Sequence, residues 1–163
     1  MFYQNSINSE VLDAVNYKIE NQQNKQNEAE KARRRINEAN TIKNMNYRNN
    51  WSDYIRASSN RYSYREMGGI SDLEVIVTKK TEYMLDEVGV LVHYIQANGD
   101  NFNSETVTIY NVPANSSKSM SAPESKRGTS VNMDIQGIIS KKMHFCYSSG
   151  NWGSNSEDPY FCK

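Results

Sequence analysis

The side chains that most often do chemistry are few in this sequence and lie far apart. The two histidines, His93 and His144, stand about fifty residues from each other, and the two cysteines are Cys146 and Cys162. A zinc site needs three or four such ligands held together. His144 and Cys146 share one face of a predicted strand, but no spacing supplies the third, orienting group of a Cys–His nucleophile pair.

Motifs for phosphate-binding loops, zinc proteases and serine hydrolases are absent as well. The acidic neighbours Asp86 and Glu87 would face opposite sides of a strand, so they do not form an acid–base pair. Glu157, Asp158 and Asn155 offer oxygen atoms to calcium, but without the regular spacing of a calcium-binding loop. We therefore expect a non-enzymatic protein with no catalytic residue, no cofactor and no metal.

The two cysteines allow two interpretations. A bond between Cys146 and Cys162 would close a loop of about 16 residues, stabilise it by roughly 3 kcal/mol and indicate an oxidising compartment. The alternative is a pair of free thiols in a cytoplasmic protein. The position of Cys146 at a strand end and of Cys162 next to the C-terminus favours the disulfide.

Aromatic residues form the candidate interaction surface. Its members are Trp51, Tyr54, Tyr62, Tyr64 and Trp152. Residues 51, 54 and 55 share one helical face, which indicates that they dock a helix end against a neighbouring domain. The alternative is a platform on which a carbohydrate or another small ligand stacks.

The composition bounds the class of protein. The chain has 163 residues, 37% of them hydrophobic, a mean hydropathy of −0.83 and a net charge of zero. This balance argues against nucleic acid as a partner. No apolar run reaches eighteen residues and the start does not resemble a signal peptide, so contact with a membrane would need an anchor not present in this chain.

The N-terminal part predicts a long helix. From Ser6 to Ser58 there is no proline or glycine, and either would cost about 1–3 kcal/mol inside a helix. Apolar residues recur at helical spacing near the start, and a thin alanine-rich stripe follows around Ile36. Either this helix is a solvated spacer, or it pairs with another protein or with a second copy as a weak coiled coil.

Strands follow from Ile70 onwards. Apolar residues recur at every second position at Val88, Val90, Val92 and Tyr94, and an Asn-Gly turn at 98–99 separates them from the next strand. Similar runs near residues 73–77, 105–110, 131–135 and 143–147, with a short polar edge strand at 117–121, predict six or seven antiparallel strands without helices between them. This pattern is typical of a β-sandwich.

Three stretches carry a family resemblance. They are T-x-Y-x-L-D-E-V-x-V-x-V-x-Y-I-x-A-N-G with E-T-V-T-I-Y-N-V-P-A-N-S-S (Thr81 to Ser117), A-P-E-S-x-R-G-T-S-V (Ala122 to Val131) and F-C-Y (145–147). Together they resemble the small immunoglobulin-like or fibronectin-III-like module of bacterial envelope proteins that is similar to FxLYD-type domains. The resemblance spans about residues 70–147, implies an extracytoplasmic location, and carries over no site residue.

These observations predict an α+β protein in which a long N-terminal helix precedes an antiparallel Ig-like β-sandwich. The expected parts are a helical stalk (1–60), an aromatic junction (61–70), the sandwich (71–147) and a disulfide-closed C-terminal loop (148–163). The expected function is a cell-envelope module for protein–protein interaction or assembly. Carbohydrate or small-ligand binding is the alternative function, and the cytoplasm is the alternative location.

Overall fold

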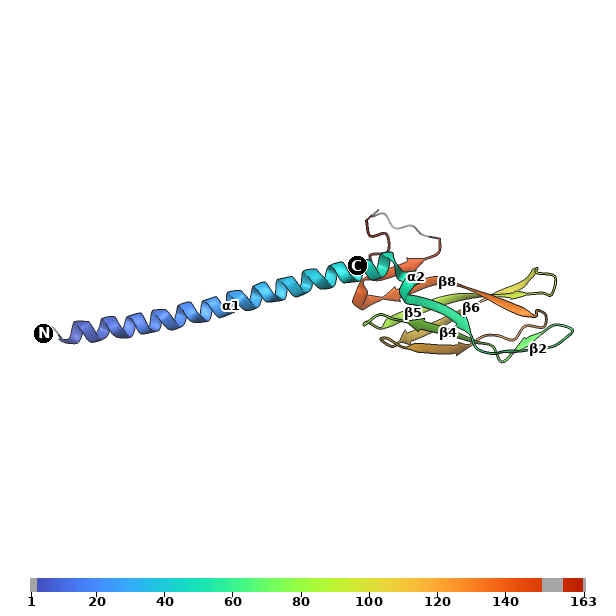
Figure 1. The fold of residues 1–163 in the computed structure, drawn as a ribbon, viewed down its shortest axis with the longest axis horizontal. Helices are drawn as coiled ribbons and strands as arrows, with labels where there is room; N and C mark the ends of the chain where they lie inside the picture. The colour runs from blue at the N-terminus through green and yellow to red at the C-terminus, as the bar shows by residue number, and fades with distance from the viewer. Residues whose placement is uncertain (1–2, 151–156, 163) are drawn as a thin grey trace. The chain divides into compact units, whose positions relative to one another are not determined.

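The structure is a computed structural model that describes the backbone of residues 3–150 and 157–162, with side chains from residue 11 onwards. The chain divides into two compact units, residues 1–43 and residues 44–163. We call them the helical unit and the sheet unit. A long helix followed by antiparallel sheets confirms the α+β class (Figure 1).

Helix α1 spans Tyr3–Asn49, and the short helix α2 spans Trp51–Tyr54. Asn50 separates them with a non-helical backbone (φ −116°, ψ 33°). The helix prediction is wrong for residues 55–58, because strand β1 (Ile55–Ser59) follows α2 directly. The absence of proline and glycine permits a helix there, but β1 instead forms a full ladder with β4, and this tertiary pairing outweighs local propensity.

A three-stranded sheet has the order β1-β4-β7, where β4 is Glu74–Lys79 and β7 is Ser117–Ser121. Ile55 pairs with Lys79 at one end of the β1–β4 ladder, and Ser59 pairs with Val75 at the other. The predicted polar edge strand at 117–121 is confirmed as β7. Its five residues pair only with β4 among the strands that the structure describes.

A four-stranded sheet has the order β6-β5-β8-β9. Its strands are β5 (Leu85–Ile95), β6 (Asn101–Val112), β8 (Ser130–Ser140) and β9 (Phe145–Ser148), with a 3-10 turn, η1 (Lys141–Met143), between β8 and β9. The predicted Asn-Gly turn joins β5 to β6, where the Gln96 amide donates to the Asp100 carbonyl. A separate two-stranded hairpin consists of β2 (Ser63–Tyr64) and β3 (Ile70–Ser71).

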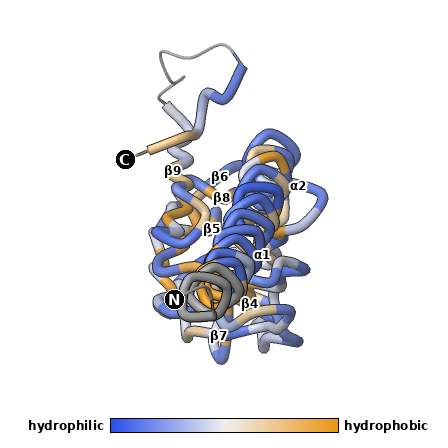
Figure 2. Tube along the Cα trace, turned by 90° about the vertical axis from the view of Figure 1, so that its left-hand side faces the viewer, coloured by the Kyte–Doolittle hydropathy of each residue, from blue (hydrophilic) through white to orange (hydrophobic). Residues whose placement is uncertain are grey.

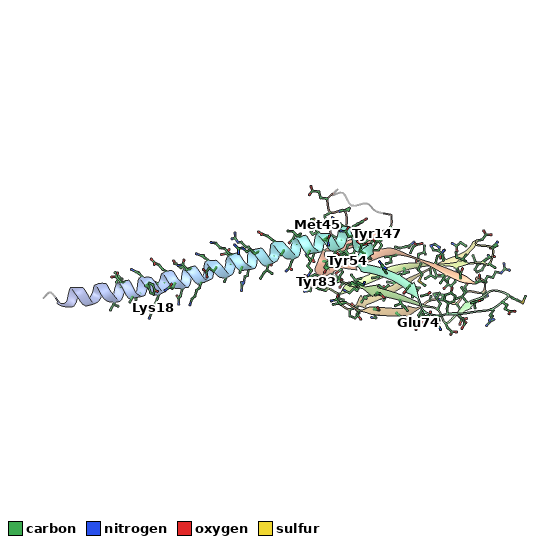
Figure 3. The ribbon with its side chains drawn as sticks, viewed as in Figure 1. Lys18, Met45, Tyr54, Glu74, Tyr83 and Tyr147 are labelled. Atoms are coloured by element: carbon green, nitrogen blue, oxygen red, sulfur yellow. A yellow bond between two sulfur atoms is a disulfide. The ribbon has the colours of Figure 1, made fainter. Side chains whose placement is uncertain are left out.

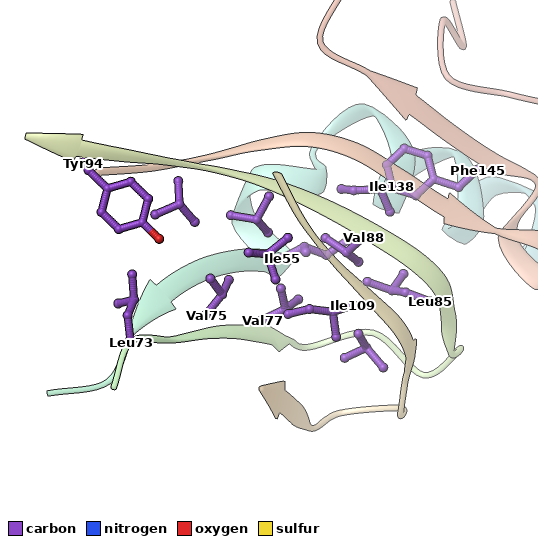
Figure 4. Close-up of a cluster of buried hydrophobic side chains, with 14 of the residues drawn as sticks. Ile55, Leu73, Val75, Val77, Leu85, Val88, Tyr94, Ile109, Ile138 and Phe145 are labelled. Atoms are coloured by element: carbon purple, nitrogen blue, oxygen red, sulfur yellow. The ribbon is translucent and has the colours of Figure 1, made fainter. Parts of the chain in front are cut away.

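One hydrophobic cluster draws on both larger sheets. Val75 and Val77 of β4 belong to it together with the alternating residues of β5 from Val88 to Tyr94, as Figure 4 shows for the labelled members. The period-two alternation of β5 places these side chains on one face of the sheet, and burial of each contributes about 1.5–3 kcal/mol. Every described residue that is fully buried lies at position 48 or beyond, within the sheet unit.

Candidate functional site

Arg48, in the last turn of α1, is buried inside the sheet unit and forms a salt bridge with Asp158. Only 3% of the Arg48 side chain is exposed, and its Nε lies 2.9 Å from Asp158 Oδ1. A second nitrogen of the guanidinium donates to the backbone carbonyl of Met143. The planar guanidinium thus joins the helix end to the C-terminal segment and to η1, a geometry that suits arginine better than lysine.

Aromatic rings surround this salt bridge. The Trp51 ring lies 4.5 Å from that of Tyr147, and the Tyr54 ring packs edge-on against Tyr47 at 4.8 Å. Tyr160 packs against Tyr147 in turn, with ring centroids 5.4 Å apart. Figure 3 shows Tyr54 and Tyr147 at the same end of the sheet unit. Burial, followed by the nearby Tyr160 and Asp134, raises the pKa of the Tyr147 phenol.

The disulfide fixes the C-terminal segment on β9. Cys146 and Cys162 are bonded to each other, with Cα atoms 5.7 Å apart, as their positions in the sequence predicted. Two backbone hydrogen bonds flank the bond, from the Cys146 amide to the Tyr160 carbonyl and from the Cys162 amide to the His144 carbonyl. We call Arg48, Trp51, Tyr147, Asp158 and this disulfide the clasp.

The opposite end of the sheet unit carries three loops that we call the tip, formed by residues 65–68, 96–100 and 122–129. Figure 1 shows β2, next to the first of these loops, at the end opposite α2. Two hollows, of about 340 and 280 Å³, lie between the loops. Met67 and Arg127 line the larger hollow, and Arg65 and Lys126 line the smaller one.

Two glycines bring the tip loops together. Gly69 has a φ of +116°, and its amide donates to the carbonyl of Gly128. Gly128 has a φ of +117°, and an added Cβ there would lie 3.4 Å from the Ile95 carbonyl oxygen. Side-chain-bearing residues rarely adopt this backbone conformation. The Tyr94 hydroxyl donates to the Pro123 carbonyl and secures the third loop to β5.

Several large apolar side chains at or beside the tip are exposed to solvent. Met67 is 98% exposed, Tyr64 in the adjoining strand β2 is 62% exposed, and Phe102 is also exposed. The guanidinium carbon of Arg127 lies 5.9 Å from the centre of the Phe102 ring, within cation–π range. Apolar groups among arginines and glutamates give the tip the composition of a contact surface.

The predicted aromatic surface is therefore divided between the two ends. Trp51 and Tyr54 pack within the clasp region, and Tyr62 is partly buried against the core. Tyr64 lies beside the tip. Trp152 falls outside the residues that the structure describes. The five residues do not form one platform, and the predicted junction at 61–70 contains the β2–β3 hairpin, whereas the helix end packs through residues 47–54.

His93 takes part in a polar network across three strands. Its Nδ1 lies 2.7 Å from Ser104 Oγ, its Nε2 lies 3.2 Å from Asp134 Oδ2, and Asn101 donates to Ser104 at 2.9 Å. The residue types match a serine–histidine–aspartate arrangement. The carboxylate of Asp134 is 74% exposed, however, which gives the network none of the water exclusion that strengthens such a site. We assign the network to strand pairing.

Lys79 is a buried amine at the end of β4, with 1% of its surface exposed. Its Nζ donates to Thr81 Oγ1 at 3.0 Å and to the Thr81 carbonyl at 3.3 Å. Burial lowers the pKa of Lys79 from 10.5 to about 8. Among the described residues, no group of three or more His, Cys, Asp or Glu side chains is arranged to hold a metal ion.

No sequence pattern predicts that Arg48 and Asp158 interact. They are 110 positions apart, and the neighbours of Asp158 in the sequence suggest only oxygen ligands for calcium. Arg48 is the basic residue in the last turn of the helix, but that position alone does not indicate a partner.

No helix in the described part of the chain is long and apolar enough to cross a membrane. No protein-family model, curated protein or solved structure matches this chain.

Proposed function

We propose that this chain is a non-enzymatic module of the cell envelope that binds another protein through its tip. In this proposal the three-stranded and four-stranded sheets are the two layers of an Ig-like β-sandwich, and α1 is the segment that carries it. The single core shared by both sheets supports the sandwich. The disulfide suits an oxidising, extracytoplasmic compartment.

The exposure of Met67 is the observation that carries the proposal. A methionine that is 98% exposed at the end of a loop contributes nothing to the core of its own chain. Large apolar side chains rimmed by polar ones mark protein-binding surfaces, in which methionine, tyrosine and arginine are enriched. Tyr64, Phe102 and Arg127 supply the other three members of such a surface.

The alternative function, binding of a carbohydrate or small ligand, has less support. Trp51 and Tyr54 are engaged in ring contacts within the sheet unit, so neither presents a free face for sugar stacking. The larger hollow, about 340 Å³, is within the usual size of a ligand pocket. Tyr64 is an exposed tyrosine two residues before Glu66, which lines this hollow, and binding that depends on Tyr64 would favour this alternative.

Photo-crosslinking from position 67 tests the proposal. A photoreactive residue replaces Met67 in one variant and Ser119, an exposed residue of β7, in the control variant. We expect a specific crosslinked protein from position 67 alone. The purified partner should then bind the unmodified chain, and Met67→Glu should weaken that binding about tenfold or more while Ser119→Glu leaves it unchanged.

Equal crosslinking from both positions, or equal affinity of the two glutamate variants, would contradict the proposal. Binding to a glycan array that is lost with Tyr64→Ala but kept with Met67→Glu would select the alternative function.

A further inference from the structure

The helical unit lacks the packing that normally stabilises a helix. Every side chain from Val11 to Ile42 is exposed. Figure 3 shows side chains such as Lys18 projecting freely from α1, and Figure 2 shows hydrophilic colouring over much of its length. Eleven of the 47 residues of α1 are asparagine, a weak helix former. Isolated helices are marginal in water, since most helical stability in proteins comes from packing an amphipathic face.

One face of α1 has the spacing of a coiled-coil contact. Starting from Leu12, steps of three and four residues alternate in the way that heptad core positions do. These positions, which we call the seam, are Leu12, Val15, Ile19, Gln22, Gln26, Ala29, Arg33, Ile36 and Asn40. The first three positions of the seam are apolar, two successive glutamines follow, and the last four positions alternate between apolar (Ala29, Ile36) and polar (Arg33, Asn40) side chains.

We propose that the seam pairs with the same seam of a second copy of this chain, parallel and in register. A glutamine or asparagine side chain carries both donors and an acceptor, so identical amides facing each other satisfy one another. In register, Gln22, Gln26 and Asn40 each meet their own counterpart. A different partner would have to present amides at the same three layers, and polar core residues of this kind specify register.

Charges beside the seam favour the parallel arrangement. Lys25 directly precedes the core residue Gln26, and Glu30 directly follows the core residue Ala29. In a parallel pair these two flanking positions, five residues apart, face each other across the interface, so Lys25 meets Glu30 of the second copy. The neighbouring pairs, Lys18 with Gln23 and Ala32 with Asn37, contain no like charges. Arg33 is the least favourable residue of the seam, because it places a charge at a core position. Its long stem allows the guanidinium to extend into solvent.

An antiparallel pairing also aligns the glutamines, with Gln22 against Gln26 and Leu12 against Ile36. It then places Arg33 against Val15, and Lys25 of one copy beside Lys25 of the other. An apolar–charged layer and a like-charge contact both oppose this arrangement. The parallel register has one like-charge layer, Arg33 against Arg33, but it keeps Val15 in an apolar layer and gains two Lys25–Glu30 pairs.

Light scattering on the full chain across a concentration series tests the association. We expect the mass of two copies at high concentration. Ile19→Asp should raise the dissociation constant about tenfold or more, because each copy loses a buried apolar side chain. Asn24→Asp, which adds the same charge on the opposite face of the helix, should leave it within about threefold of wild type.

The orientation is tested by crosslinking. Cys146 and Cys162 are bonded to each other, so Leu12→Cys introduces the one free thiol. Mild oxidation should link two Leu12→Cys chains to each other. Crosslinking only when Leu12→Cys is mixed with Ile36→Cys would show an antiparallel pair and overturn the proposal.

Charge reversal gives a third, independent measure. Lys25→Glu should weaken association about threefold to tenfold, since it creates two like-charge contacts, and adding Glu30→Lys should restore it. A chain that stays monomeric throughout the concentration series overturns the inference. Protein binding by the tip would be unaffected, since it uses only residues of the sheet unit.

Discussion

Lys79 shows how a single side chain can set the pH dependence of stability. Its ammonium group is buried and donates to Thr81, and this burial lowers its pKa from 10.5 to about 8. Below about pH 8 the folded and unfolded chains are both protonated at this site, and the full cost of burying the charge is present. Between about pH 8 and 10.5 only the unfolded chain is protonated, so the free energy of unfolding should rise with pH, by at most about 3 kcal/mol.

We therefore expect Lys79→Met to raise the free energy of unfolding at pH 7 by about 1–3 kcal/mol, since the stem is retained and the charge is lost. The variant should also lack the rise that the wild type shows above pH 8. Urea unfolding at pH 7, 8 and 9.5 measures both effects. Lys80→Met, at the exposed neighbouring position, serves as the control and should keep the wild-type pH dependence.

The Arg48–Asp158 salt bridge leads to a second prediction about individual side chains. Asp158→Ala leaves the buried guanidinium without its counter-charge and should cost about 3–5 kcal/mol of unfolding free energy. The double variant Arg48→Met with Asp158→Ala should cost clearly less, because it removes both charges. Chemical denaturation of the four proteins gives the coupling energy. Additive losses would mean that the two side chains do not interact.

How much of each element the sequence predicts depends on its length. β5 alternates without a break from Val88 to Ile95, so the period alone predicts it. β2 and β3 have two residues each, too few for any period to appear. β1 lies in a stretch without proline or glycine, where the local sequence favours a helix. It forms a strand because it pairs with β4, and the sequence near β1 does not reveal this pairing. The tip forms from three loops that are distant in sequence, so only the aromatic character of Tyr64 pointed toward it.

The C-terminal segment is an element held by three kinds of contact: a disulfide, a salt bridge and backbone hydrogen bonds to residues 144 and 146. Replacing both cysteines by serine should lower the free energy of unfolding by about 3 kcal/mol, given the sequence separation of 16. Thermal unfolding measures the change. Wild-type protein in a reducing buffer should show the same loss, whereas the serine variant should not respond to the reductant.

At the scale of the whole molecule, the two units differ in where their stability originates. Residues 44–163 contain every buried described residue, the clasp and the disulfide. Residues 44–163 alone should therefore fold. In urea unfolding followed by tryptophan fluorescence, their midpoint should equal that of the full chain at low protein concentration. Only the full chain should gain helical circular dichroism as its concentration rises, because mass action stabilises the associated form. A shortened chain that is unfolded would contradict the division into units.

The bond between Arg48 and Asp158 also has a consequence for biosynthesis. The ribosome adds the 110 residues that separate the two partners at roughly 5–20 residues per second, so Arg48 waits on the order of 5–20 s for its carboxylate. During that interval its charge must stay hydrated, and the end of α1 cannot settle into its final position. The strands from β4 to β8 can pair in the meantime. The clasp therefore closes after these strands have paired, and oxidation of Cys162, four residues after Asp158, locks it.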